Sequence, residues 1–197
     1  ESGAVQIQNG KNVVRLWVDA NHPAVHLEIK TEQPARLTAK SELWRTQDYH
    51  LNPRAVSQAG FFEWGNNPNG LDFEADTILP AQNNQVAWCH FNSHSIYPLV
   101  FEREHLESLL PKYPDPLLHR CFGVAMKGPD LQSENNLTLQ SATAAKSFRL
   151  DLYALTQQAD SPADWKSALD KAVAATDAVK IKTAWEAHQQ WWTDFWN

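Results

Sequence analysis

The residues best suited to chemistry lie in one polar stretch between positions 90 and 97. It carries four side chains that can bond a ligand: His90, Asn92, His94 and Tyr97. His90 and His94 are four residues apart, a spacing that brings two imidazoles to one metal ion on a helix. The preceding residues 85–91 are strand-like, so the two rings need not converge, and no third ligand is in view. The stretch therefore predicts side chains that hydrogen-bond a polar ligand, or that brace their own loop, rather than a zinc site.

A second candidate is a row of alternating carboxylates. Asp72, Glu74 and Asp76 share one side of an extended chain. Three carboxylates can hold Ca²⁺, but no glycine-punctuated loop of the EF-hand type accompanies them, so a solvated strand face is the favoured interpretation. Paired carboxylates for glycoside hydrolysis cannot be recognised by spacing. No G-x-S-x-G elbow, Walker loop or G-x-G-x-x-G occurs. We therefore assign no catalytic residue, no metal and no cofactor.

Tryptophan is the unusual component of the composition, with nine residues among 197. Indole rings stack on pyranose rings, and they also pack well in cores. Trp17 stands among charged neighbours on one face of a predicted strand, and Trp64 lies in a long loop rich in Gly, Asn and Pro. Both are candidates for sugar stacking, and the alternative for Trp17 is packing beneath a neighbouring loop or domain.

The C-terminal stretch 184–197 predicts an unusually aromatic helix. One stripe of this helix carries Trp185, His188, Trp192, Phe195 and Trp196. So much aromatic area requires a large surface to bury it, since each ring removes roughly 150–250 Å² from water. The stripe is predicted to be a docking surface between two domains. The helix has no C-cap and no basic last turn, and we expect the chain to be a piece of a larger protein.

The elements that position these residues are mostly strands. Residues 5–8 and 13–19 alternate around Asn9-Gly10, the strongest short hairpin signal. A third strand contains Val25, Leu27 and Ile29, and a fourth spans 36–44, which makes an antiparallel meander typical of a β-sandwich. Further strands are predicted at 78–80, 85–91, 121–126, 137–139 and 147–153, and a short helix at 102–110.

The composition changes at Ser161-Pro162, where an N-cap, a proline and Asp164 predict a helix start. Asp177 is predicted to cap a second helix that runs to the end. The expected organisation is a partial β-sandwich domain at 1–155, incomplete at its N-terminal edge, and a helical linker at 161–197.

The net charge and the distribution of apolar residues exclude some classes of partner. The net charge of −6 argues against a nucleic-acid partner, which requires a clustered basic face. No run of 18 apolar residues exists, so no membrane span is expected. Cys89 and Cys121 both lie in apolar strand-like runs, where two buried free thiols are the favoured interpretation and one disulfide the alternative.

Three stretches resemble an uncharacterised domain at the N-terminal side of secreted bacterial glycoside hydrolases. The first is LWVDANHP at 16–23, followed by ELWR at 42–45. The second is WCHFN at 88–92, continuing through Ser95 and Tyr97 to PDPLLHRCFG at 114–123. The third is AH at 187–188 with WWTDFWN at 191–197, the most specific of the three. The sequence departs from the family pattern at Cys89, Phe91 and Cys121.

This resemblance implies a sandwich of the supersandwich type that precedes an (α/α)6 barrel, as in α-L-fucosidase-like enzymes, joined by a Trp-rich helix. It implies a secreted or periplasmic bacterial protein, with the barrel and a poly- or oligosaccharide substrate as partners. The general acid and base of such enzymes lie mainly in the barrel, so none carries over to this chain. The expected function is a non-catalytic domain that braces the barrel and lends a loop to its cleft. The alternatives are a stand-alone carbohydrate-binding module or a purely structural domain.

Overall fold

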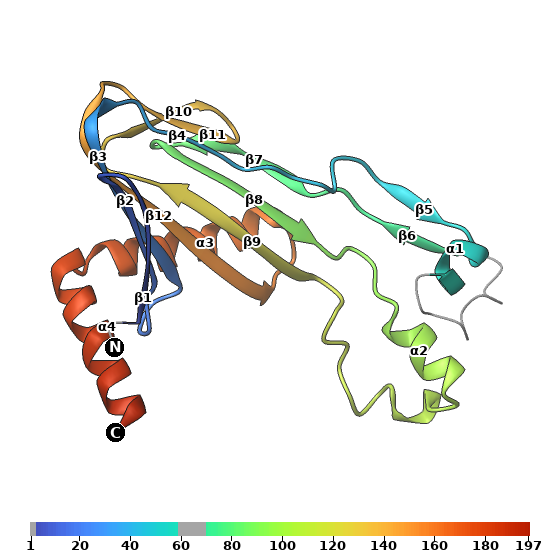
Figure 1. Ribbon diagram of the computed structural model, residues 1–197. Helices are drawn as coiled ribbons and strands as arrows, with labels where there is room; N and C mark the ends of the chain where they lie inside the picture. The colour runs from blue at the N-terminus through green and yellow to red at the C-terminus, as the bar shows by residue number, and fades with distance from the viewer. Residues whose placement is uncertain (1–2, 59–69) are drawn as a thin grey trace.

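The computed structural model describes residues 3–58 and 70–197. Its largest element is a seven-stranded antiparallel sheet in the order β1-β2-β3-β12-β9-β8-β7 (Figure 1). The strands are β1 (Ala4–Asn9), β2 (Asn12–Val18), β3 (Ala24–Ala35), β7 (Thr77–Gln82), β8 (Gln85–Phe91), β9 (Arg120–Lys127) and β12 (Ala145–Gln158). The predicted class, mainly β with antiparallel sheets and a C-terminal helical region, is confirmed.

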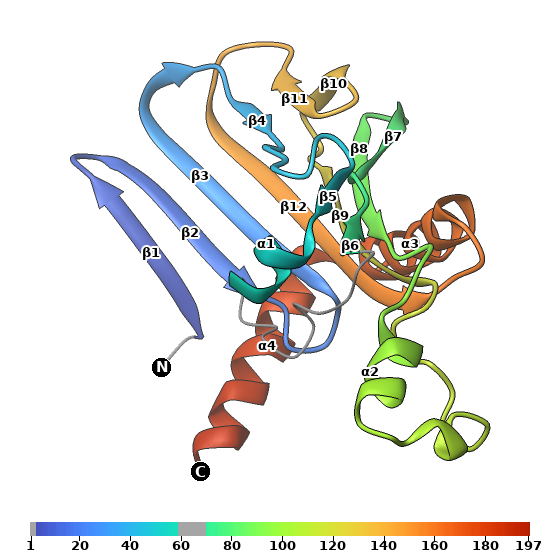
Figure 2. The ribbon, with the colours of Figure 1, turned by 90° about the vertical axis from the view of Figure 1, so that its right-hand side faces the viewer.

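The first three strands form the predicted meander. Asn9 pairs with Asn12 across the β1–β2 turn, and Gly10 between them has a φ of +61°, a conformation that favours glycine. β3 follows β2 in antiparallel register. The long strand β12 then pairs with β3 on one side and β9 on the other, so it joins the N-terminal strands to the later ones (Figure 2).

Two smaller sheets complete the β structure. One has the order β10-β11-β4, with β4 (Thr38–Lys40), β10 (Leu131–Asn135) and β11 (Thr138–Ser141); the other pairs β5 (Tyr49–Leu51) with β6 (Leu71–Phe73). The predicted fourth strand at 36–44 is therefore too long, and it does not continue the meander. It shrinks to β4, which leaves the large sheet because Ala39 pairs with Leu139 of β11.

Neighbouring residues of the central strands face opposite sides of the large sheet. Val86 and Met126 pack towards the three-stranded sheet, in a core completed by Ala39, Leu131, Leu139 and Leu150. Ala87 and Ala125, one position away, face the helices. Both faces of the sheet are thus covered in this region, which explains why β8 is apolar on both sides.

The helices α3 (Pro162–Asp177) and α4 (Ile181–Trp196) lie on the second face (Figure 1). α3 begins as predicted, because the Ser161 hydroxyl accepts a 3.1 Å hydrogen bond from the Asp164 backbone N–H. Its buried residues Trp165, Leu169 and Val173 share a core with β8, β9 and β12. The segment 162–177 is therefore packed on the sheet rather than extended from it.

The predicted cap of the second helix is wrong. Asp177 is the last residue of α3, and Lys180 is the N-cap of α4. The reason is a tertiary contact: the Asp177 carboxylate accepts hydrogen bonds from Tyr153 and Lys127 of the sheet.

The remaining helices lie with β5 and β6 at the end of the molecule opposite α4 (Figure 1). They are α1 (Pro53–Gln58), α2 (Tyr97–Arg103) and a single 3₁₀ turn at Glu107–Leu109. The helix predicted at 102–110 begins earlier than expected, since Pro98 fits its first turn. It ends before His105, whose φ of +55° interrupts it.

Candidate functional site

Three of the four predicted ligand-binding residues meet in one hollow. His90 is the penultimate residue of β8, and Asn92 and His94 follow in the loop to α2. The hollow has a volume of about 330 Å³ and is lined by Arg45, Asp72, Phe73, Glu74, His90, Asn92, His94, Ser95, Ile96, Leu117 and Phe122. Tyr97 lies outside this lining. The hollow combines hydrogen-bonding groups with two phenyl rings, a composition suited to a polar ligand of modest size.

His90 is held by a buried carboxylate. Asp76, whose side chain is fully buried, lies 3.1 Å from His90 Nδ1 and accepts a 2.7 Å bond from Arg45 Nε. The carboxylate can only accept, so Nδ1 carries the hydrogen and Nε2 is left to bond a ligand. Phe122 packs beside both groups, 5.2 Å from the His90 ring and 5.5 Å from the Arg45 guanidinium carbon. A buried carboxylate that orients an imidazole is the arrangement of a general base. The loop hydroxyls of Ser93 and Ser95 are already engaged, the first with Glu74 and the second with the Tyr97 backbone N–H.

His94 is paired with Glu74 at the rim of the hollow. Its Nδ1 lies 3.0 Å from Glu74 Oε1, and the Ser93 backbone N–H donates to Glu74 Oε2 at 3.0 Å. The Ser93 hydroxyl donates to the same carboxylate. Burial by itself raises the pKa of Glu74, but these hydrogen bonds outweigh it and hold that pKa below its ordinary value. Glu74 therefore stays ionised, and the 85% exposed His94 side chain is available to a ligand.

In the structure, each of the three alternating carboxylates pairs with a histidine. Asp72 bonds His50 Nδ1 at 2.7 Å, which adds a third pair to those of Glu74 and Asp76. The predicted solvated strand face is wrong for Asp76, whose side chain is buried by Arg45 and His90. Within residues 3–58 and 70–197, no three His, Cys, Asp or Glu side chains are grouped to hold a metal ion.

Asn92 and Tyr97 brace the loop. The Asn92 side-chain amide donates to the Leu117 carbonyl at 3.2 Å, and its backbone carbonyl accepts from the His119 N–H at 2.8 Å. Tyr97 packs its ring 4.4 Å from Phe101 within α2. Asn92 thus ties the candidate loop to the segment before β9, which keeps His94 and His90 at a fixed separation.

Sequence reasoning missed Arg45 and Phe122. Arg45 closes the hollow from a segment 31 positions before Asp76, and Phe122 reaches it from β9. Both residues fall in stretches quoted for the family resemblance, at 42–45 and 114–123. No hydrophobic period or turn signal marks them as site residues, because only the pairing of β8 with β9 and the contact of Arg45 with Asp76 bring them to the hollow.

Comparison with known families gives one result. Residues 1–197 match the profile of an N-terminal domain of unknown function, DUF5703. The chain belongs to the DUF5703 family. That description assigns no activity, and no curated protein matches the chain. In the described parts of this DUF5703 domain, no helix combines the length and the apolar character needed to cross a bilayer.

Trp17 lies beneath α4 in this DUF5703 domain. It is fully buried, with ring centroids 4.3 Å from His26, 5.2 Å from Trp185 and 5.0 Å from His188. No face of the indole is open, so in this arrangement Trp17 has no surface for sugar stacking, and it packs as the alternative interpretation describes. Trp64, the other stacking candidate, lies outside the described residues.

The aromatic stripe of α4 is divided between two environments. His188 is fully buried, and its Nε2 lies 3.0 Å from the Gly3 carbonyl, while Trp185 carries the Arg15 guanidinium carbon 4.4 Å above its ring. The C-terminal part of the helix differs: Trp191, Phe195 and Trp196 are 41%, 59% and 66% exposed. The first half of the stripe therefore docks on this chain's own sheet. Phe195 and Trp196 of its second half, with Trp191 beside the stripe, form what we call the exposed aromatic face (Trp191, Phe195 and Trp196).

The two cysteines are free and buried, as the favoured interpretation predicted. They lie on neighbouring strands β8 and β9, and burial raises the pKa of both thiols. They are packing residues and not nucleophiles, since a thiol reacts only as thiolate.

Proposed function

We propose that this domain is the non-catalytic N-terminal part of a secreted glycoside hydrolase, where its hollow contributes to binding a poly- or oligosaccharide. The observation that carries the proposal is the hollow itself. Arg45, His90 and His94 supply hydrogen-bonding groups beside the rings of Phe73 and Phe122. Sugars bind through hydrogen bonds to hydroxyls and through packing of their apolar faces on aromatic rings. The resemblance of the motifs at 88–97 and 114–123 to glycoside hydrolase domains supports the same substrate class.

The surroundings of His90 support a non-catalytic role. The imidazole has an orienting carboxylate, Asp76, but the hydroxyl of Ser93 in the nearby loop is already bonded to Glu74. Glycoside hydrolysis requires one protonated and one ionised carboxyl group. Glu74 is held ionised and Asp76 is buried behind His90 and Arg45. In our proposal the reacting carboxyl groups belong to the barrel, and this domain positions the sugar.

The exposed aromatic face is the second part of the proposal. Trp191, Phe195 and Trp196 present large apolar surfaces on one helix, and such patches mark interaction sites more often than free surface. We assign this face to the contact with the helical catalytic domain, which α4 would brace against the sheet.

The test uses the full-length protein and three single variants. His90→Ala and His94→Ala each remove one hydrogen-bonding group from the hollow, and we expect kcat/KM on the cleaved glycan to fall about tenfold, the effect of one lost hydrogen bond. His22→Ala is the matched control, because it removes a histidine of another carboxylate pair, and neither His22 nor its partner Asp19 lines the hollow. Unchanged turnover in both hollow variants, or an equal loss in His22→Ala, would contradict the assignment of the loop.

A glycan panel run against the isolated domain separates the remaining alternatives. Our proposal expects little binding without the barrel. Tight binding by the isolated chain would instead indicate a stand-alone carbohydrate-binding module.

A further inference from the structure

The two edges of the large sheet differ in how they are protected against further pairing. In the described part of the chain, the edge strand β1 pairs only with β2, and the edge strand β7 pairs only with β8 (Figure 2). β7 carries Pro80, and its register with β8 shifts between Leu79 and Gln82. Proline and bulges are common devices that stop a sheet edge from pairing with another chain. β1 has neither, because its register with β2 is continuous from Ala4 to Asn9.

β1 also carries no charge. Its sequence, AVQIQN, contains only apolar and amide side chains, and all of its residues after Ala4 are exposed. Charged side chains, lysine above all, are a third common protection of a sheet edge. β1 therefore presents a continuous, uncharged row of backbone groups, which is the arrangement that accepts another strand.

The backbone groups that face this open edge belong to alternate residues. Asn9 and Asn12 flank a two-residue turn, and such a turn is closed by a hydrogen bond from the Asn12 N–H to the Asn9 carbonyl. Hydrogen-bonded and non-hydrogen-bonded pairs alternate along an antiparallel ladder. The odd-numbered residues of β1 therefore bond β2, and the N–H and C=O groups of Ala4, Gln6 and Gln8 point away from it.

Two apolar side chains of β1 are left in water. Val5 and Ile7 are 58% and 62% exposed. Val5 pairs with Leu16, which pairs in turn with Leu27, and Leu27 packs against the core below the three-stranded sheet. Val5 and Ile7 therefore lie on the face of the large sheet opposite the helices, in the part that the small sheet does not bury.

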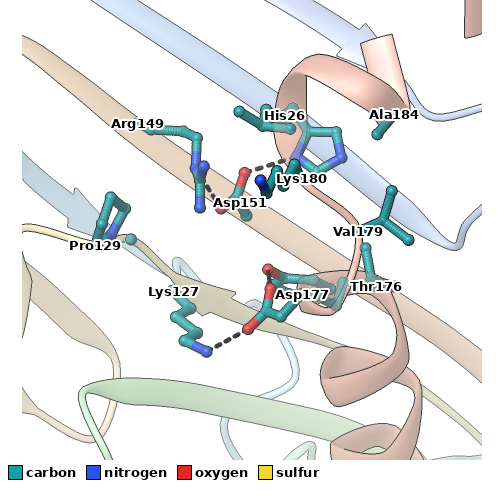
Figure 3. A pocket seen from close by; sticks show the side chains of 13 residues that line it. His26, Lys127, Pro129, Arg149, Asp151, Thr176, Asp177, Val179, Lys180 and Ala184 are labelled. Carbon is teal, nitrogen blue, oxygen red and sulfur yellow. Dashed lines mark hydrogen bonds and ion pairs between the residues drawn. The ribbon is translucent and has the colours of Figure 1, made fainter. Parts of the chain in front are cut away.

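The helix-covered face holds the strands next to β1 in place. His26 Nδ1 of β3 lies 2.6 Å from Asp151 of β12, and Arg149 donates to the same carboxylate at 2.9 Å (Figure 3). Trp17 of β2 packs its ring 5.2 Å from that of Trp185 in α4. β1 is therefore bonded to strands that are fixed from behind, and its outward backbone groups are held as a template.

We propose that β1 pairs with β1 of a second copy of this chain, in antiparallel register about a twofold axis at Gln6. In this register Gln6 lies opposite Gln6 of the second copy, and Val5 lies opposite Ile7, so amide meets amide and apolar side chain meets apolar side chain. Ala4 lies opposite Gln8, and all three residues with outward backbone groups exchange hydrogen bonds across the axis.

The absence of charge on β1 favours a second copy over a strand of another protein. A twofold axis brings residues of one strand close to the same residues of its partner, so a charged side chain at the centre would meet a like charge. β1 has no charge to oppose itself, and none by which a charged partner strand could recognise it. The interface of residues 4–8 is small beside the roughly 1,600 Å² of a standard complex, so we expect association at micromolar concentrations. This association is independent of the function proposed for the hollow.

Sedimentation velocity of the full-length protein between about 1 and 100 μM measures the association. We expect the mass to rise from that of one chain towards twice that value. Gln6→Lys and Gln6→Glu each place two like charges opposite one another at the axis, and each should raise the dissociation constant at least about fivefold. An equimolar mixture of the two variants should restore the association, because opposite charges then meet across the axis.

Gln8→Lys is the matched control. Gln8 is an exposed glutamine on the same strand and the same face, but in the proposed register it lies opposite Ala4. Two ammonium groups at position 8 would be about 14 Å apart along the strands, four residues at about 3.4 Å each. This separation exceeds the Debye length of about 8 Å at physiological ionic strength, so the dissociation constant should change by less than about twofold.

The mass of one chain at every concentration overturns the proposal, and it is the result expected if a strand from elsewhere in the full-length protein covers this edge. An association that Gln6→Lys leaves unchanged, equal weakening by Gln6→Lys and Gln8→Lys, or a mixture that does not restore the association overturns it as well. Both glutamines are exposed, so the variants are expected to fold, and circular dichroism checks that they do.

Discussion

Two glycines offer a matched test of how α4 is held against the sheet. Gly3 and Gly10 have nearly the same backbone conformation, with φ of +64° and +61°. A Cβ added at Gly3 would lie 2.1 Å from Trp192 Cδ1 and 2.7 Å from His188 Nε2, whereas a Cβ at Gly10 would meet no atom within 4 Å. Alanine at either position therefore introduces the same backbone strain, and only Gly3→Ala adds a collision with α4.

The expected losses follow from these two contributions. Left-handed backbone costs a residue with a Cβ roughly 1 kcal/mol, which is the whole loss expected for Gly10→Ala. Overpacking adds about 1–3 kcal/mol, because Trp192 and the buried His188 must move together with their helix. The free energy of unfolding should therefore fall by about 2–4 kcal/mol in Gly3→Ala.

Urea unfolding followed by tryptophan fluorescence measures both losses on one scale. Adding Trp192→Ala to Gly3→Ala should recover part of the loss, since the double variant removes the atom that collides. If Gly3→Ala and Gly10→Ala lose the same free energy, the contact of α4 with Gly3 does not hold the helix, and the reasoning is refuted.

Two further predictions concern α3 and the buried ionisable groups. Ser161→Ala should lower the free energy of unfolding by about 1 kcal/mol, because it removes the N-cap of α3. The control is Ser167→Ala, at an exposed position within the same helix, which should change the free energy of unfolding by less than about 0.5 kcal/mol. Similar losses in the two variants would contradict the capping role. The raised pKa values of Cys89 and Cys121 give a pH dependence with a defined sign. Above pH of about 8.5 the unfolded chain releases thiol protons that the folded chain retains, so stability should fall as pH rises, by up to about 1.4 kcal/mol per pH unit for each thiol. Replacing both cysteines with alanine should flatten that slope, and a native chain whose stability is constant between about pH 8 and 10 would argue against buried thiols.

Local signals predicted the local structure well. The Asn9-Gly10 turn, strand β8 and the start of α3 at Ser161 depend on neighbours within a few residues, and each is where the sequence indicates. Asp115, directly before Pro116, accepts hydrogen bonds from the Leu117 and Leu118 N–H groups, as an N-cap residue does.

Long-range contacts account for the misses. Asp177 carries the signature of an N-cap, but Tyr153 and Lys127 compete for its carboxylate and win. The same holds for the candidate site. His90, Asn92 and His94 are recognisable as a polar stretch, whereas Asp76 and Arg45 acquire their roles only when Asp76 contacts both Arg45 and His90 of β8. The hydrophobic period of a strand and the residues of its turns do not indicate which distant strand it will pair with.

The position of β12 sets the order in which this sheet can be assembled. β3 finds its second neighbour only in β12, through pairs that run from Ala35 with Ala145 to Ala24 with Tyr153. During synthesis, one edge of β3 therefore stays unpaired until residues 145–158 have left the ribosome. Pairing at such a separation in sequence is slow, because the loop must close before any contact is gained. A chaperone that covers the free edge of β3 would act in that interval, and chains halted before Ala145 should aggregate through this edge.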